Sequence, residues 1–148
     1  MELRRATGED SETILSWRND KDTRENSFSK EEISLETHNR WFEKKLADPG
    51  CKMYILEDHG DRLGSIRIDI LDEKGKIGEI SYMIAPDKRR HGYGRKILEL
   101  IEKKARETGI EVLTGLVKAD NPASCRCFEN CGYTAAYAGD IVSYTKLI

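Results

Sequence analysis

The sequence predicts an α+β domain in which one largely antiparallel, twisted sheet of six to seven strands is flanked by about four helices. Three observations indicate this fold class. Three apolar runs follow one another between residues 53 and 84 with only short turns between them, which is typical of antiparallel strands. Residues 92–108 repeat apolar side chains every three or four positions, which indicates a helix. The 148 residues contain no repeat, low-complexity tract or linker, so we expect one domain over 1–148.

The first fifty residues predict one strand and two helices. Residues 2–6 form the strand, and the first helix follows from residues 7–9 to Asn19. Residues 21–30 are polar and have no period, so they predict a loop near the substrate. The second helix begins at Ser34 and ends at residues 48–50, Asp-Pro-Gly. Its helical spacing is set by Leu35, His38, Trp41, Phe42 and Leu46.

The remaining elements follow from alternation, turn residues and one strong helical period. Strands are expected at 53–56, 63–70 and 78–84, with turns at 58–61 and 72–75. The long helix runs from Gly92 to Thr108, and Gly109 caps it. The residues that we expect this helix to bury are Ile97, Leu98, Leu100 and Ile101. A strand at 112–117, a short helix opened by Pro122 and a hairpin of residues 133–137 and 141–147 around Gly139 complete the chain.

The composition describes an ordinary soluble globular protein, with 35% charged and 38% hydrophobic residues. No run of about twenty apolar residues occurs, so we expect no membrane span, and the N-terminus lacks a signal peptide's apolar core, which predicts the cytoplasm. Residues 1–80 carry 14 Lys/Arg against 19 Asp/Glu, a balance of −5, and residues 81–148 carry 11 against 8, a balance of +3. The acidic half is either solvated surface or an attraction for an amine. Nucleic acid is not expected as a partner, because no long basic face is present.

Three cysteines lie close together at Cys125, Cys127 and Cys131. Their spacing differs from the Cys-x-x-Cys pairs of structural zinc sites, and a helix would turn Cys125 away from Cys131. We therefore predict no metal, and interpret these cysteines as small buried hydrophobic residues.

A basic loop joins the strand at 78–84 to the long helix. Arg89, Gly92 and Gly94 form Arg-x-x-Gly-x-Gly there, and the first NH groups of the helix have no partner within it. Such a terminus favours phosphate. The loop does not fit a Rossmann unit, which needs a third glycine and a βαβ frame, or a P-loop, which needs Gly-Lys-Ser/Thr.

This loop resembles the cofactor-binding motif of the GCN5-related N-acetyltransferase (GNAT) superfamily, Gln/Arg-x-x-Gly-x-Gly/Ala. A second motif of the family, Asn-x-x-Ser/Ala followed by an aromatic and Gly-Phe/Tyr, is matched by Asn121, Ser124, Phe128, Gly132 and Tyr133. The resemblance covers residues 75–135 well and the remainder loosely. The predicted order of strands and helices is also the order that the family implies.

The resemblance implies acetyl-CoA as the acetyl donor. Residues 80–84 would splay from the strand at 112–117 and pair with the pantetheine arm through Met83 and Ile84, and a backbone NH near Met83 would polarise the thioester carbonyl. The loop would donate NH groups to the pyrophosphate, with Lys88, Arg89 or Lys96 near the adenosine phosphates. The implied cofactor-binding residues are Met83, Ile84, Arg89, Arg90, Gly92, Tyr93, Gly94, Arg95, Asn121, Ser124 and Phe128.

Two catalytic roles follow from the resemblance. Glu79 is the predicted base, because it shares one strand face with Ser81 and Met83, and an acidic residue in this strand often takes the amine proton in the family. The alternatives are a structural Glu79 and His38 as the base. Many members place a Tyr at the position of Phe128 to protonate the thiolate, and Phe cannot donate. Ser124 or water is then the expected donor, with a tyrosine from elsewhere or no dedicated acid as alternatives.

The acceptor is predicted from the N-terminal half, which resembles a subgroup that includes ribosomal-protein and nucleotide-linked amino-sugar acetyltransferases. The sugar branch fits better, so we expect a small-molecule amine, namely a nucleotide-linked amino sugar. The expected contacts are Trp17, Arg18, Asn19, Arg24, His38 and Trp41. The aromatic residues could instead pack the helices on the sheet. A protein N-terminal acetyltransferase and a non-catalytic acyl-CoA-binding domain stay open, as does the choice between monomer and homodimer.

Overall fold

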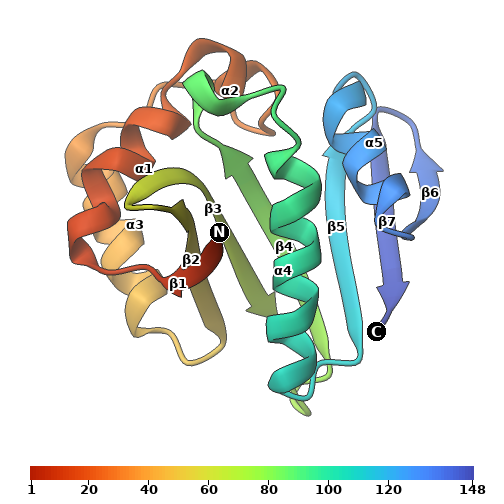
Figure 1. The fold of residues 1–148 in the computed structure, drawn as a ribbon. Coiled ribbons are helices and arrows are strands. Elements are labelled where there is room, and N and C mark those ends of the chain that lie inside the picture. Colours follow the sequence, from red (N-terminus) through yellow and green to blue (C-terminus); the bar gives the residue numbers. More distant parts are fainter.

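One seven-stranded sheet organises the computed structural model, which describes all residues 1–148 in the strand order β1-β2-β3-β4-β5-β7-β6 (Figure 1). The pair β4 and β5 is parallel, and every other neighbouring pair is antiparallel. The strands are β1 (Glu2–Arg5), β2 (Cys51–Asp58), β3 (Asp61–Ile70), β4 (Ile77–Ile84), β5 (Val112–Lys118), β6 (Thr134–Ala138) and β7 (Ile141–Leu147). The predicted α+β class and largely antiparallel sheet are confirmed.

Helices cover both faces of this sheet. They are α1 (Ser11–Arg18), α2 (Lys21–Glu25), α3 (Leu35–Ala47), α4 (Tyr93–Glu107) and α5 (Pro122–Asn130), with 3₁₀ turns η1 (Gly8–Asp10) and η2 (Pro86–Lys88). On one face, α4 and α5 bury the larger core, which includes Ile97, Leu98 and Phe128. On the other face, α1 and α3 bury a smaller core, which includes Ile14 and Phe42. Figure 1 shows α1 and α3 grouped on one side of the view and α4 lying across the middle of the sheet.

The sheet is split between its two central strands. Residues 77–79 of β4 pair with residues 112–114 of β5, and the pairing stops there. Beyond Glu79, β4 keeps its partner β3 on one edge, as far as the pair of Gly64 and Ile84. On the other edge, the NH and C=O groups of residues 80–84 have no strand partner, so they are available to an extended ligand.

The structure adds one helix that the sequence pattern does not show. Residues 21–25 form α2, where a loop is predicted. The helix begins because the side chain of Asp20 accepts a hydrogen bond from the Thr23 NH, 3.2 Å away. Five polar residues are too few to reveal a helical period, and none of them is buried. With this short helix, the structure has five α-helices.

None of the helices combines the length and the apolar character needed to cross a bilayer. No three His, Cys, Asp or Glu side chains are grouped so that they could hold a metal ion, and all four cysteines are free thiols. Cys125, Cys127 and Cys131 are only partly buried, at the margin of the larger core, and not fully buried as predicted.

Candidate active site

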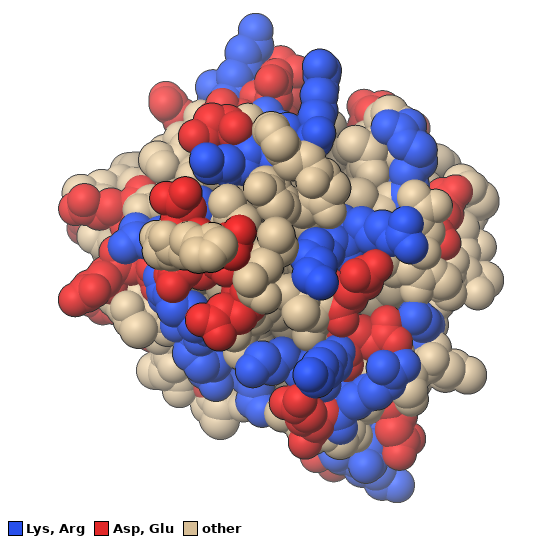
Figure 2. Space-filling view, in the orientation of Figure 1, with Lys and Arg blue, Asp and Glu red and all other residues tan.

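A groove of about 1110 Å³ opens at the split between β4 and β5 and reaches both faces of the sheet. We call its two parts the α4–α5 half, lined by Tyr82, Ser124 and the start of α4, and the α1–α3 half, lined by Arg18, Trp41 and Arg67. Residues 80–84 of β4 form the wall that the two halves share. Figure 2, in the orientation of Figure 1, shows Lys and Arg side chains at the upper end of the molecule, near the start of α4 and over α5.

The start of α4 lines the α4–α5 half with backbone. Gly92 is the N-cap with φ +78°, and no side chain caps the helix. Arg90 also adopts a left-handed conformation, with φ +65°, so the loop turns sharply just before the helix. The first turn of α4 carries no acidic residue. The free NH groups and positive end of the helix dipole therefore offer a site for an anion.

Gly94 lies in the first turn of α4, next to Cys127 of α5. A Cβ at Gly94 would lie 2.9 Å from Cys127 Sγ and 3.7 Å from the Tyr82 hydroxyl. The absence of a side chain thus allows the helix start, Cys127 and Tyr82 to share one wall.

Arg89 does not extend toward the start of α4 and instead binds α2. Its guanidinium donates to Asp20 Oδ2 at 2.9 Å and to Thr23 Oγ1 at 2.6 Å. Desolvation acts to raise the pKa of the Asp20 carboxyl, but the hydrogen bonds from Arg89 and Thr23 outweigh it and hold this pKa below its ordinary value. This differs from the expectation that Arg89 reaches the cofactor phosphates, because its donors are already engaged.

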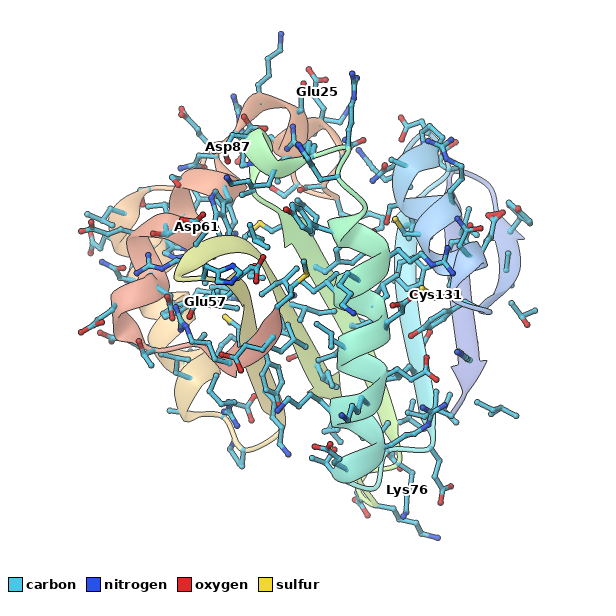
Figure 3. All side chains as sticks on the ribbon, in the orientation of Figure 1. Glu25, Glu57, Asp61, Lys76, Asp87 and Cys131 are labelled. Carbon is cyan, nitrogen blue, oxygen red and sulfur yellow. The ribbon has the colours of Figure 1, made fainter.

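A second tie holds α2 over the groove from β5. The Lys118 ammonium donates to the Glu25 carbonyl oxygen at 3.0 Å. Figure 3 shows Glu25 at the same end of the molecule as Asp87, which lies in the turn before α4. With Arg89 bound at one end of α2 and Lys118 at the other, this short helix bridges the mouth of the groove.

Ser124 lies in the first turn of α5 and faces a tyrosine of β4. The Asn121 side chain caps α5 by accepting from the Ser124 NH at 3.3 Å. The Ser124 hydroxyl lies 2.9 Å from the Tyr82 hydroxyl. Burial raises the pKa of Tyr82, and the nearby Cys127 thiol raises it further, so the phenol stays protonated and can donate a hydrogen bond. Sequence reasoning did not single out Tyr82.

Phe128 is part of the core beneath this pair. It is 2% exposed and stacks on Tyr144, with ring centroids 5.0 Å apart. It also meets Tyr82 edge to face at 6.0 Å. Its ring fills the space above Gly115, where a Cβ would lie 2.7 Å from the Phe128 ring. Phe128 therefore supports the position of Tyr82 by packing.

Glu79, the predicted base, does not line the groove. It lies in the paired part of β4, opposite Asp69 on β3 and Thr114 on β5. Its Cα is about 13 Å from that of Met83, because strands rise about 3.3 Å per residue. Figure 3 shows Lys76, just before β4, at the end of the molecule opposite Glu25. A base needs to reach the proton directly or through a water, and this position disfavours Glu79.

In the α1–α3 half, one indole lies near two guanidinium groups. The guanidinium carbon of Arg18 is 4.4 Å from the Trp41 ring centroid, and that of Arg67 is 5.2 Å from it. Arg67 lies on β3 directly opposite Ser81 of β4. Burial lowers the pKa of Arg18, and the positive charge of Arg67 lowers it further. Sequence reasoning missed Arg67.

His38 supports Arg18 from behind and is not exposed. Its side chain is fully buried; Nε2 lies 2.9 Å from the Ser11 carbonyl oxygen, and Nδ1 lies 3.0 Å from an Arg18 nitrogen. A carbonyl only accepts and a guanidinium only donates, so the ring is neutral with its proton on Nε2. Burial lowers the pKa of His38, and the Arg18 charge adds to this effect.

The remaining predicted acceptor contacts are structural supports outside the groove lining. Trp17 is buried in the smaller core. The Asn19 amide exchanges two hydrogen bonds of 2.8 Å with the backbone of Ile33. Arg24 donates to the carbonyl oxygens of Asn19 and Lys30. These bonds shape the loop after α2, which supplies part of the groove wall, and only Arg18 and Trp41 of the predicted set face the groove.

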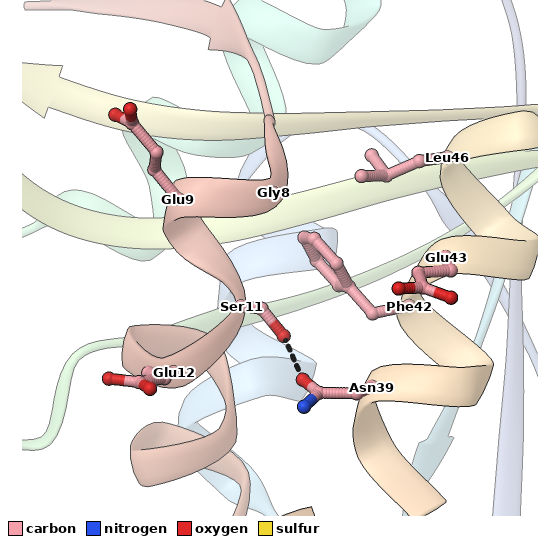
Figure 4. A pocket seen from close by; sticks show the side chains of 8 residues that line it. All are labelled: Gly8, Glu9, Ser11, Glu12, Asn39, Phe42, Glu43 and Leu46. Carbon is pink, nitrogen blue, oxygen red and sulfur yellow. Dashed lines mark hydrogen bonds between the residues drawn. The ribbon is translucent and has the colours of Figure 1, made fainter. Parts of the chain in front are cut away.

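A second, smaller cavity of about 400 Å³ lies between η1, α1 and α3 (Figure 4). Its polar wall contains Glu9, Glu12 and Glu43. Figure 4 shows the Ser11 hydroxyl donating to Asn39 Oδ1 across it, at 2.8 Å. This bond ties α1 to α3, so the cavity is bordered by a contact that holds the two helices together.

Comparison with known proteins gives one matching family. The model of the acetyltransferase (GNAT) domain matches residues 1–134. No curated protein sequence matches the chain closely enough to count as a relative.

Solved structures with the same fold include acetyltransferases that act on different amines. A spermidine N-acetyltransferase from Vibrio cholerae, in complex with CoA and spermine, has a TM-score of 0.89 at 17% identity, covering 98% of this chain and 94% of that chain. A ribosomal-protein-alanine N-acetyltransferase from Brucella melitensis has a TM-score of 0.82 at 23% identity over 100% of both chains. An aminoglycoside acetyltransferase with coenzyme A and kanamycin has a TM-score of 0.84 at 16% identity, covering 99% and 94%.

Proposed function

Because this chain belongs to the acetyltransferase (GNAT) family, we propose that it moves the acetyl group of acetyl-CoA to the primary amine of a small molecule, and that this molecule is a nucleotide-linked amino sugar. The observation that carries the proposal is the single groove that joins the start of α4 to the α1–α3 half through the split sheet. Both reactants can meet in such a groove, so the amine attacks the thioester directly.

The α4–α5 half fits acetyl-CoA. The uncapped NH groups at the start of α4 suit the pyrophosphate, and Lys88, Arg90 and Arg95 line the same part of the groove. The free edge of residues 80–84 suits an extended arm with amide groups, such as pantetheine, because that edge lacks a strand partner. Met83 and Ile84 would hold the thioester end of this arm.

The chemistry follows from groups along the shared wall. The neutral amine forms a bond to the carbonyl carbon while a backbone NH at Met83 stabilises the negative oxygen, and the carbon–sulfur bond then breaks. Ser124, hydrogen-bonded to Tyr82, would donate a proton to the leaving sulfur. The proton lost by the amine passes to solvent. The carboxylates of Glu25 and Glu31, which form no salt bridge, line the groove and can assist this transfer.

The amino-sugar assignment is supported by the side chains of the α1–α3 half. Trp41 packs against the guanidinium groups of Arg18 and Arg67, and these two groups offer donors for phosphate oxygens. The structurally similar acetyltransferases named above bind spermine or kanamycin, or act on ribosomal-protein alanine. Their range of amines is the reason for testing the acceptor directly.

The test is thiol release from acetyl-CoA by the purified protein, with mass spectrometry of the products. The panel contains nucleotide-linked 4-amino sugars, peptides with N-terminal alanine, spermidine and kanamycin. Turnover with the amino sugars alone supports the full proposal. Turnover with the peptides alone would assign the protein N-terminal function instead. Binding of acetyl-CoA without turnover of any amine would contradict the amino-sugar assignment and favour a non-catalytic acyl-CoA-binding domain.

A further inference from the structure

We propose that Arg18, Trp41 and Arg67 form a subsite for a negatively charged group of the acceptor, a phosphate or a carboxylate, so that the amine this protein acetylates is an anionic molecule. The inference rests on the proposed function and names the chemical class of its acceptor. Its basis is two partly buried guanidinium groups that lie beside one partly buried indole inside the groove.

The guanidinium of Arg18 lacks a negative partner. It makes no salt bridge, and its side-chain bond goes to the neutral ring of His38. A partly buried cation without a counter-charge is costly, as the lowered pKa of Arg18 also indicates. An acceptor that brings a negative charge to this place would remove that cost.

The neighbouring charges do not compensate for Arg18. Arg67 donates to Asp69 at 2.9 Å, but Asp69 also accepts from Lys45 at 2.8 Å. One carboxylate is therefore shared between two cations, and Arg18 adds a third. Glu79 lies across from Asp69 on the next strand and forms no salt bridge within 4.0 Å. Three cations, Arg18, Arg67 and Lys45, thus stand against two carboxylates, so the subsite has an excess of positive charge.

The position of the subsite also restricts the acceptor. Arg67 lies opposite Ser81, and Met83 is two residues further along β4. Two residues of strand span about 7 Å, so the anionic group would lie roughly that far from the carbonyl under attack. An amino sugar joined to a phosphate can span this length, whereas a polyamine would bring positive charge to two guanidinium groups.

Trp41 and His38 fix the geometry of the subsite. Trp41 packs against both guanidinium groups, and its rings also contact His38, with centroids 5.8 Å apart. His38 accepts one Arg18 hydrogen bond, which holds the planar fork of that guanidinium in place. Guanidinium groups held in this way bind oxyanions with little loss of side-chain entropy.

The experiment measures anion binding to the protein already saturated with CoA, because the start of α4 would otherwise bind phosphate as well. Inorganic pyrophosphate, uridine diphosphate, succinate and spermine are titrated by calorimetry into wild type, Arg67→Gln, Arg18→Gln and Arg40→Gln. Arg40 is the matched control, since it precedes Trp41 on α3 but is exposed and outside the groove. Arg67→Lys tests whether charge alone suffices.

We expect pyrophosphate and uridine diphosphate to bind wild type and Arg40→Gln equally, and to bind Arg67→Gln and Arg18→Gln at least about tenfold more weakly. Arg67→Lys should recover part of the loss. Binding of succinate without pyrophosphate, with the same dependence on arginine, supports the subsite and identifies a carboxylate as its guest. The proposal is overturned if spermine binds and none of the three anions does. It is also overturned if the anions bind Arg18→Gln and Arg67→Gln as tightly as wild type.

Two controls keep the result interpretable. If Arg18→Gln fails to fold in a thermal melt, Arg67→Gln carries the test, because Asp69 keeps Lys45 as its partner in that variant. If CoA does not bind at all, the proposed function fails. Pyrophosphate titrated into the free protein then still decides on the subsite, through the comparison of wild type with Arg67→Gln.

Discussion

The hydroxyl groups of Tyr82 and Ser124 lie 2.9 Å apart, although 42 residues separate them in the chain. One belongs to the free edge of β4 and the other to the first turn of α5. The pair thus joins the two elements between which a thioester would lie. It places a protonated phenol behind the serine hydroxyl, in a protein whose Phe128 cannot donate a proton.

This pair predicts a rate effect for Tyr82→Phe. We expect kcat to fall about tenfold. This is less than the roughly 10²–10⁴-fold that a general acid typically contributes, because thiolates leave readily without one. Ser124→Ala should have a similar effect, and the double variant should lose little more, since the two hydroxyls act in one chain. Steady-state kinetics measure this. Tyr133→Phe is the matched control, because its buried hydroxyl has no partner, and fully additive losses would argue against a shared role.

Arg89→Gln and Asp20→Asn should both loosen α2. Each removes the 2.9 Å ion pair between the loop and the helix, which is about one-third exposed and contributes on the order of 1 kcal/mol. We expect faster amide exchange in residues 21–25 and a several-fold higher KM for the acceptor in both variants. Hydrogen exchange with mass spectrometry detects the first effect. A large loss of CoA affinity in Arg89→Gln with unchanged exchange would instead indicate a phosphate contact.

Glu79→Gln should change kcat by less than about threefold. The side chain lies in the paired part of β4 and does not line the groove. A general base typically contributes about 10²–10⁴-fold, so the two readings are well separated. The assay is thiol release at saturating acetyl-CoA. A hundredfold loss with an unchanged melting temperature would restore Glu79 as the base, acting through water.

The stability of the protein should fall as the pH drops below 6.5, the ordinary pKa of histidine, because the pKa of buried His38 lies below that value in the folded state. The unfolded chain then binds more protons than the folded chain, so the free energy of unfolding decreases with decreasing pH. Above pH 6.5 this contribution is constant. Urea denaturation between pH 5 and 7.5 measures the slope, which should be shallower in His38→Gln. An identical slope in both proteins would assign it to other groups.

Gly94→Ala should destabilise the protein by about 1–3 kcal/mol, because the added Cβ would lie 2.9 Å from Cys127 Sγ. Cys127→Ala removes that sulfur, so the double variant should regain most of the loss. Gly8→Ala is the control, since nothing lies within 4 Å of its Cβ position. Denaturant titrations measure all four proteins. A double variant no more stable than Gly94→Ala would place the cost in the backbone of the helix start.

Most elements of the fold could be predicted because local pattern and burial agree. In α4 the helical spacing identifies four core residues. Ile97, Leu98 and Ile101 are fully buried, whereas Leu100 is only partly buried against the core. The hairpin between β2 and β3 turns at His59 and Gly60, both with positive φ, as such short turns require. The helix α2 escaped prediction because its stability comes from Asp20, Arg89 and Lys118 and not from an apolar face.

The site was less predictable, because its geometry depends on contacts between distant segments. Arg67 alternates with Ile66 and Ile68, a pattern typical of a solvent-facing position, yet α1 and α3 cover that side of the sheet. The motif that contains Arg89 is present, but its side chain found partners on α2 that no local pattern reveals. Only the assembled sheet brings Tyr82 to Ser124.

The order of the groove's side chains along the chain has an evolutionary consequence. Arg18, Trp41 and Arg67 all precede the turn between β3 and β4, whereas the start of α4 and all of α5 follow it. A genetic crossover in that turn would exchange the side chains that we propose face the acceptor and keep those that we propose face acetyl-CoA. Selection for a new amine can therefore act on the first half of the gene while the machinery of acetyl delivery is inherited intact.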